Sequence, residues 1–406
     1  MALNANHLRV RMYRVGFGEC FLVSLPVDGG HRHLLIDCGV HPMADLRTLP
    51  AVLQDVAAEC GQRLDLVVAT HEHADHISGF GSQASAFEAL GLGEIWMPWA
   101  LDPEDRQAAQ LREDRLSLLA ALGAHFDAVG GSASARAALV NLRGNDLAVH
   151  ALRSGFGGRA AAVRYPSAGE RLTLPGIPGL HVRVLAPPRD EAFLRQMQPP
   201  RSQRFLRASG RAAVPANPVE PFARKWRLRP VAGRQTYGFT AREERQLRGL
   251  GDAAEELALA MSRIVNNTSL VLLLEHRGRN LLFTGDAQWG NWRSWIDGPS
   301  AEALLESISF LKVAHHGSHN ATPKSALEAM DRRRLVAMVS TQSRPWASIP
   351  QTRLMQALAT QTRRRVARSD AIAVQGAPTP PAGQRTLPRA FRHQAGDLWA
   401  DWRIRV

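Results

Sequence analysis

Three histidines and one aspartate lie within six residues of one another: His71, His73, Asp75 and His76. They follow directly on a largely apolar run, residues 64–70, of the kind that forms a buried strand. Side chains on the turn that leaves a sheet edge can converge on one point. Imidazole and carboxylate groups at this density suit one or two zinc-class ions. A single histidine is more often an ordinary core or surface residue, but four potential ligands at one strand end favour a metal site.

Two further groups at strand ends complete the candidate site. Asp286 ends the apolar run 280–286 and is placed to supply the shared anion that two close metal ions need. His315 and His316 follow another strand-like run, and the glycine after them lets the backbone approach the site closely. We expect one of these two histidines to bind metal and the other to face the substrate. The alternatives are a turn aspartate for Asp286 and two imidazoles on an ordinary turn.

The elements that must position these groups are strands and helices in mixed order. Residues 8–25 alternate polar and apolar side chains around a Gly-rich turn, and a third strand-like run follows over 33–39. Three strands joined by short turns predict an antiparallel start to a sheet. We predict helices over 43–58, interrupted by Pro50, and over 104–122. The C-terminal residues alternate in the manner of a closing edge strand.

The formal charge of +13 is unevenly distributed along the chain. Between Arg189 and Arg248 there are fourteen Arg or Lys residues and only five Asp or Glu residues. Proline pairs interrupt every periodic pattern in this segment. We predict a single domain over residues 1–406 with a basic insertion at 187–251 and a C-terminal extension at 378–406. Arginine makes forked contacts to phosphate, so nucleic acid or another phosphate-rich partner is one interpretation. The other is a solvated surface of a protein rich in arginine.

Composition narrows the class of protein. The chain is 406 residues long and 45% hydrophobic, which is enough to bury a large core. It has no apolar run near the roughly 18 residues that a membrane span needs, and no signal-peptide pattern at its start. Cys20, Cys38 and Cys60 are an odd number at wide spacing, which favours buried free thiols over a disulfide or a zinc cluster. We therefore expect a cytoplasmic protein that does not enter the membrane; its oligomeric state is not indicated.

Taken together, these motifs resemble the metallo-β-lactamase superfamily. The resemblance rests on His-x-His-x-Asp-His at 71–76, on Leu-Leu-Ile-Asp-Cys-Gly at 34–39 and on Thr-Gly-Asp at 284–286. A finer resemblance is to the hydrolase domain of the competence protein ComEC and its stand-alone relatives. It rests on Val-Gly-Phe-Gly-Glu at 15–19, Asn-Asn-Thr-Ser-Leu-Val at 266–271 and Leu-Lys-Val-Ala-His-His-Gly-Ser at 311–318. The matches run from about Val10 to Ser340 and leave out the insertion.

The resemblance implies a four-layer αββα sandwich of the α/β class, with the site at the open edge between two sheets. It implies that one metal ion is held by His71, His73 and Asp286. It also implies that the other is held by Asp75, His76, Asp286 and His316. Asp37 would be an acid that orients one of the ligands, and the alternative is an aspartate that ends a strand at a turn.

We predict a hydrolase with two divalent metal ions, with zinc as the first choice and manganese as the alternative. The ions would activate a bridging water molecule, and His315 would stabilise developing charge or protonate the leaving group. A phosphodiester, as in a nuclease or phosphodiesterase, is the favoured substrate because the finer resemblance and the Arg-rich segment agree. The alternatives are a hydrolase of a small ester, thioester or lactam, and a binding or regulatory module whose metal site is inactive.

Overall fold

The structure is a computed structural model of the chain. It describes residues 3–44, 46, 48–129, 132–143, 145–205, 258–259, 261–342, 345–346, 348–374, 387–393 and 396–406. Of the predicted insertion, only residues 187–205 belong to this set, so the rest of the Arg-rich segment lies outside the described residues. Within the described parts, no helix combines the length and the apolarity that crossing a bilayer requires.

One sheet has eight strands in the order β14-β15-β1-β2-β3-β4-β5-β6. The predicted antiparallel start is present, since β1 pairs with β2 and β2 with β3 in antiparallel register, and the sheet then continues in parallel from β3 to β6. Its strands are β1 (His7–Tyr13), β2 (Cys20–Val27), β3 (Gly30–Cys38), β4 (Arg63–Val68), β5 (Gly91–Trp96), β6 (Ala160–Arg164), β14 (Phe391–Arg392) and β15 (Trp399–Arg405).

The other sheet has seven strands in the order β13-β12-β11-β10-β9-β8-β7. Strands β7 to β10 pair in antiparallel register, and β10 to β13 run in parallel. Its strands are β7 (Arg171–Leu172), β8 (Leu180–Ala186), β9 (Val271–His276), β10 (Arg279–Phe283), β11 (Phe310–Lys312), β12 (Val336–Val339) and β13 (Val366–Arg368).

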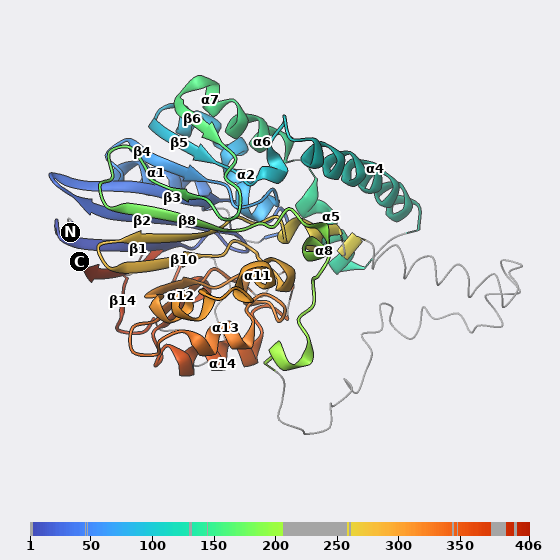
Figure 1. Cartoon of the computed structure of the whole chain (residues 1–406). Helices are drawn as coiled ribbons and strands as arrows, with labels where there is room; N and C mark the ends of the chain where they lie inside the picture. The colour runs from blue at the N-terminus through green and yellow to red at the C-terminus, as the bar shows by residue number, and fades with distance from the viewer. Residues whose placement is uncertain are drawn as a thin grey trace, which may run out of the picture.

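Helices cover the outer face of each sheet, and this arrangement confirms the predicted four-layer αββα sandwich (Figure 1). Helices on the first sheet's side are α1 (Leu49–Glu59), α2 (Ala74–Ser82), α3 (Ala84–Glu88), α4 (Arg106–Val129), α5 (Ala133–Leu142), α6 (Asp146–Arg153) and α7 (Gly155–Gly158). Those on the second sheet's side are α8 (Glu191–Leu194), α11 (Trp289–Ile296), α12 (Ala301–Ser307), α13 (Lys324–Ala329) and α14 (Thr352–Gln361).

Three apolar clusters hold the four layers together. The central cluster joins the inner faces of both sheets, for example Phe21 and Phe283, whose ring centroids are 6.0 Å apart. A second cluster joins the first sheet to α1, α2, α3 and α6, and a third joins the other sheet to α11 through α14. Because strand side chains alternate between faces, most strands, for example β4 and β9, contribute to the central cluster and to one outer cluster. The predicted free thiols are also present, since all three cysteines are buried and unbridged.

Two expectations about individual elements are wrong. The helix predicted over 43–58 begins only at Leu49, so that Pro50 lies in its first turn, where the missing N–H of proline breaks no helical hydrogen bond. The C-terminal strand β15 is not an edge strand, because it pairs with β1 on one side and with β14 on the other. A strand of seven residues in the interior of the sheet is an integral part of the fold.

Candidate metal centre

The turn from β4 to α2 carries the first group of candidate ligands. The side chains of His71 and His73 lie on the same side of this turn, with His71 Nε2 2.9 Å from His73 Nδ1. Helix α2 begins directly after His73, so Asp75 and His76 belong to its first turn. All four side chains are buried, with at most 2% of each residue exposed. The sequence therefore gathers four donor groups on the short segment that links a strand to a helix.

Asp286 lies just beyond β10 and faces this turn. The residue before it, Gly285, has a positive φ of 49°, and a Cβ atom there would lie 2.9 Å from the Cβ atoms of Ser269 and Thr70. Only glycine fits this close approach, which brings Asp286 to the histidines. The backbone N–H of Asp286 donates to Ser269 Oγ at 3.0 Å and fixes the orientation of the peptide.

His315 and His316 lie in a short 3-10 turn after β11, and both have a positive φ, 47° and 52°. This conformation is uncommon for residues other than glycine and costs free energy, so the surrounding structure must impose it. It separates the two rings. His316 is buried, with Nε2 2.9 Å from Asp75 Oδ2 and Nδ1 2.9 Å from the Ser340 carbonyl oxygen. The side chain of His315 keeps 19% of its surface exposed.

The buried donors form two groups that share Asp286. His71, His73 and Asp286 form one group, and Glu19, His76, Asp286 and His316 form the other, with donor atoms within 4.8 Å of one another in each. Asp75 also belongs beside the second group through its contact with His316 Nε2. This division places every residue of the two predicted ligand sets near its expected partners and adds Glu19, which was not predicted.

The donor atoms fit divalent metal ions of the zinc class. His76 Nε2 and Asp286 Oδ1 are both buried, accept or donate no hydrogen bond in the described structure, and lie 3.2 Å apart. Two ligands of a tetrahedral zinc ion at roughly 2.0–2.1 Å are about 3.3 Å from each other. Buried polar atoms without hydrogen-bond partners are rare and call for an explanation, and a metal ion between them provides one.

The charges of the site favour cations. Burial alone would raise the pKa of Asp286, but the neighbouring His76 and His316 rings hold it well below its ordinary value. Burial likewise opposes protonation of His76, yet the carboxylates of Asp286, Glu19 and Asp37 raise its pKa well above 6.5. The acids thus attract positive charge into a buried space. Burial lowers the pKa of His71 and of His73, so both rings are neutral, which is the form that binds metal.

Asp37 occupies a position behind one ligand. It ends β3 with a positive φ of 55°, and its Oδ2 lies 2.7 Å from His76 Nδ1. The same carboxylate accepts hydrogen bonds from the Thr70 N–H and hydroxyl group at 2.7 and 2.8 Å. An acid in this place can select the nitrogen of His76 that faces the metal site.

Two buried charged residues next to the site escaped the sequence analysis. Lys312, at the end of β11, is 1% exposed and forms an ion pair with Glu19. Its Nζ also donates to the Gly285 carbonyl oxygen at 2.6 Å. Both residues lie inside motifs that carried the finer resemblance, at 15–19 and 311–318. The signal that could have found Lys312 is a charged residue in an otherwise apolar strand, whereas Glu19 lies in the Gly-rich turn before β2.

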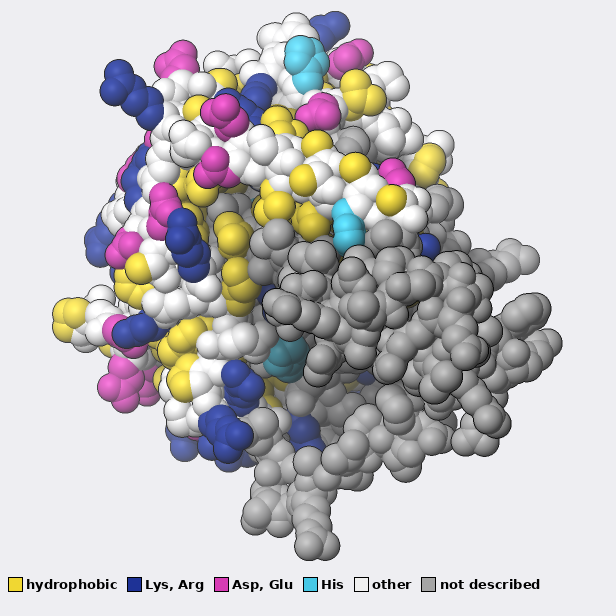
Figure 2. All heavy atoms as spheres, turned by 90° about the vertical axis from the view of Figure 1, so that its right-hand side faces the viewer, with side chains coloured by type: hydrophobic (Ala, Val, Ile, Leu, Met, Phe, Trp, Pro, Cys, Tyr) yellow, Lys and Arg dark blue, Asp and Glu magenta, His cyan; other side chains and the backbone are white. Residues whose placement is uncertain are grey.

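A cavity of about 200 Å³ lies in front of the metal ligands. His315 lines it together with polar residues that were not predicted: Arg263, Asn266, His319 and Asn320. Asn266 Nδ2 and Gln288 Nε2 lie 3.3 and 3.4 Å from the two ring nitrogens of His315. A neutral imidazole has one N–H, so one of these amides must present its oxygen to the ring, and the pair fixes the orientation of His315. Figure 2 shows basic and acidic side chains interspersed over the described part of the surface on this side of the molecule.

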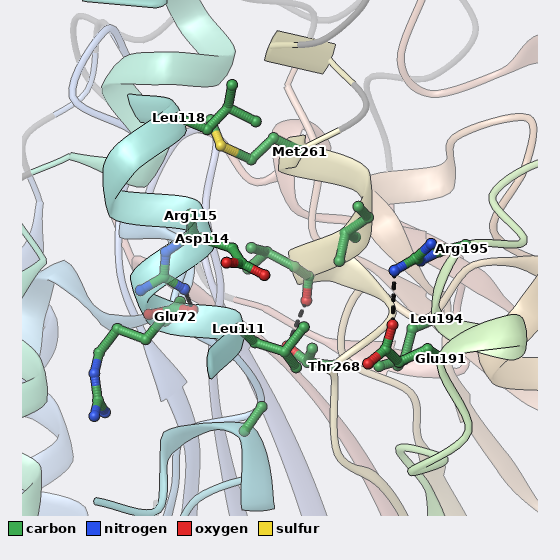
Figure 3. A pocket seen from close by; sticks show the side chains of 14 residues that line it. Glu72, Leu111, Asp114, Arg115, Leu118, Glu191, Leu194, Arg195, Met261 and Thr268 are labelled. Atoms are coloured by element: carbon green, nitrogen blue, oxygen red, sulfur yellow. Dashed lines mark hydrogen bonds and ion pairs between the residues drawn. The ribbon is translucent and has the colours of Figure 1, made fainter. Parts of the chain in front are cut away.

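Glu72, between the two clustered histidines, points away from the metal ligands. It lines a separate pocket of about 220 Å³ between α4 and the segment that contains Met261 and Thr268 (Figure 3). There it forms an ion pair with Arg115 of α4. Glu72 thus links the metal-binding turn to α4, a helix outside the sheet.

The chain was compared with protein families, curated proteins and solved structures. Residues 13–149 match the family model of the metallo-beta-lactamase superfamily, from the end of β1 into α6, and the match includes the histidine cluster. No curated protein matches the chain. Among solved structures, the metallo-beta-lactamase fold protein YhfI from Bacillus subtilis matches with 10% sequence identity and a TM-score of 0.37, over 89% of this chain and 96% of that chain. The two sheets and their flanking helices form the metallo-beta-lactamase fold. Within this fold, residues 13–149 carry the sequence signature of the metallo-beta-lactamase superfamily.

Proposed function

We propose that this protein is a hydrolase with two divalent metal ions that cleaves phosphodiester bonds. The observation that carries the proposal is that two groups of buried ligands share one carboxylate, Asp286. His71 and His73 would hold one ion, and Asp75, His76 and His316 the other, with zinc as the first choice. Ions bound by these ligands would supply Lewis acidity and bring the pKa of a water molecule towards neutrality.

The residues of the chain itself have two tasks in this reaction. Asp37 and the Ser340 carbonyl oxygen fix the rings of His76 and His316, so that the Nε2 atoms converge with Asp286. His315 lies at the cavity wall with a neutral ring, because burial lowers its pKa to about 4. Its single ring N–H, which an amide oxygen of Asn266 or Gln288 accepts, can be transferred to a substrate oxygen on which negative charge develops once the substrate displaces that amide. Donation at this place would stabilise the transition state more than the ground state.

Two features favour a phosphodiester over a small ester, thioester or lactam. Arg263 lines the cavity beside His319, and a guanidinium group recognises phosphate oxygens through forked hydrogen bonds. The resemblance of three motifs to ComEC-type hydrolases supports the same substrate class. Nucleic acid is the phosphodiester that we favour, because the sequence between Arg189 and Arg248 has fourteen basic residues against five acidic ones.

The test compares substrates on one preparation of protein. Metal-loaded protein, with Zn²⁺ or Mn²⁺, is given bis-p-nitrophenyl phosphate, single-stranded DNA and RNA, and separately p-nitrophenyl acetate, a thioester and a chromogenic β-lactam. We expect turnover of the phosphodiesters only. Asp286→Asn should abolish it, whereas Asp297→Asn, at an exposed position next to α11, should not. Turnover confined to the acetate, thioester or lactam would favour the small-molecule hydrolase.

Two further results bear on the alternatives. Binding of nucleic acid through phosphate contacts should weaken steeply as salt concentration rises, because counterions are released on binding. If the protein binds two metal ions but turns over none of the six substrates, and Asp286→Asn behaves like the natural protein in every assay, the chain is a binding module and not a hydrolase.

A further inference from the structure

Lys312 is a lysine in the interior of the protein. It is the last residue of β11, pairs in parallel register with Phe283 of β10, and is 1% exposed. A buried ammonium group is costly unless it is paired and hydrogen-bonded. The partners of the Lys312 ammonium group therefore indicate its role.

All three partners belong to, or directly precede, the ligand group that contains Glu19, His76, Asp286 and His316. The ammonium group donates to the Gly285 carbonyl oxygen at 2.6 Å, forms an ion pair with Glu19, and lies 3.6 Å from Asp286 Oδ1. Gly285 is the positive-φ residue whose conformation sets the direction of Asp286. Lys312 thus holds the peptide that precedes the shared ligand and faces one oxygen of its carboxylate.

Glu19 is near both histidines of the second ligand group, but it faces the wrong nitrogens to be a ligand beside them. Its carboxylate oxygens lie 3.6 Å from His76 Nδ1 and 4.0 Å from His316 Nδ1. Those two nitrogens already face Asp37 and the Ser340 carbonyl oxygen, while the Nε2 atoms face Asp286. Glu19 therefore lies behind the rings, where its clearest partner is Lys312.

We propose that Lys312 is a positioning residue for Asp286, and that Glu19 is the counter-ion that keeps the ammonium group in place. The proposal rests on the two-metal centre of the proposed function. The ammonium group lies beside Oδ1 of Asp286 and holds the carboxylate so that Oδ2 points towards His315 and His316, at 4.0 and 3.5 Å. The pair also brings one fixed positive charge that balances Glu19, so that the remaining acids of the centre stay available to the metal ions.

The test uses metal binding as its readout. Lys312→Met removes the ammonium group and retains the aliphatic chain, Glu19→Gln removes the counter-charge, and Lys324→Met is the control at an exposed lysine. Each full-length protein is freed of metal and titrated with Zn²⁺ and Co²⁺ against a chelator. The Co²⁺ absorption spectrum reports ligand geometry, and near-UV circular dichroism reports the fold.

We expect Lys312→Met to bind at least one ion about 10- to 100-fold more weakly, the usual loss when a group that orients a ligand is removed. Its Co²⁺ spectrum should change, whereas Lys324→Met should match the natural protein. Glu19→Gln should still bind two ions. The double variant Glu19→Gln/Lys312→Met leaves no unpaired buried charge, so it should fold even if Lys312→Met does not, and it should still bind metal weakly.

Natural affinity and an unchanged Co²⁺ spectrum in Lys312→Met, or in the double variant where the single one is unfolded, would overturn the proposal. So would a Glu19→Gln protein that binds only one ion, since Glu19 would then be a direct ligand. None of these measurements uses hydrolysis. A natural protein that binds two ions but hydrolyses no phosphodiester would refute the proposed function and leave the role of Lys312 intact.

Discussion

The Asp37 carboxylate lies 2.7 Å from His76 Nδ1, on the opposite side of the ring from the Asp286 carboxylate, which lies 3.2 Å from His76 Nε2. Asp37 therefore fixes the orientation of the ring through Nδ1, while Asp286 faces Nε2 within the metal centre. Asp37 achieves this from a strand end with a positive φ, a conformation that aspartate and asparagine tolerate better than most residues.

Asp37→Asn should weaken metal binding while the fold persists. Asparagine accepts the same backbone conformation, but its NH2 group must face either the Thr70 N–H, which Oδ1 now accepts, or the Thr70 hydroxyl group and His76 N–H, which Oδ2 now accepts. We expect about a 10- to 100-fold loss of Zn²⁺ affinity, measured by chelator competition. Asp28→Asn, at an exposed turn, is the matched control, and equal affinities of the two variants would contradict the role assigned to Asp37.

Glu72→Gln should affect stability and not metal content. The glutamate lies in the ligand cluster along the sequence but pairs with Arg115, whose side chain is 17% exposed. Without the carboxylate, a largely buried guanidinium group loses its partner, which should lower the free energy of unfolding by about 1–3 kcal/mol. Chemical denaturation of the metal-loaded protein measures this loss. A protein that unfolds as before, or that loses one of two bound ions, would show that Glu72 has a different role.

His315→Ala should separate catalysis from metal binding. His315 lines the cavity, whereas its neighbour His316 meets Asp75 and Asp286. We expect two bound ions and a loss of about 10²- to 10⁴-fold in kcat on a phosphodiester, the range for removal of a proton donor or hydrogen-bond donor. His319→Ala, in the same cavity, serves as a comparison. If His315→Ala binds one ion fewer, the assignment of the two adjacent histidines has to be exchanged.

The residues that could be predicted from the sequence are those whose position depends on local pattern. His71, His73, Asp75 and His76 share one turn after an apolar strand, so their proximity follows from the chain itself. Asp286 and His316 follow other apolar runs, and the ends of strands from the two sheets meet at one edge of the sandwich and bring them within reach. The layer order followed from the resemblance and is present in the structure.

Residues whose role depends on packing between distant segments were missed. Glu19 and Lys312 are 293 positions apart, and no local pattern indicates that they meet. Glu72 lies inside the ligand cluster, yet only the placement of α4 reveals that it pairs with Arg115. The C-terminal strand was mistaken for an edge because its neighbour β14 has only two residues. Such a short strand has no periodicity that a sequence could display.

A fourth prediction concerns the pH dependence of stability and a histidine far from the metal centre. Burial, together with the nearby Arg9 guanidinium group, lowers the pKa of His33 from 6.5 to about 4. Its Nδ1 lies 3.1 Å from Ser24 Oγ, which accepts a hydrogen bond from Arg9 and keeps its own proton to donate to an unprotonated ring. The folded state therefore favours neutral His33.

Because the pKa of His33 is lower in the folded state, the unfolded chain binds the proton first as pH falls. This contribution to stability is complete above about pH 6.5 and is lost progressively between about pH 6.5 and 4. At pH 5 the loss should be about 2 kcal/mol. His33→Asn retains an acceptor towards Ser24 but does not titrate, so its free energy of unfolding should fall less between pH 7 and pH 5. Denaturation of both proteins in the presence of a chelator excludes metal release as the cause, and an equal fall in the two proteins would show that His33 is not the responsible group.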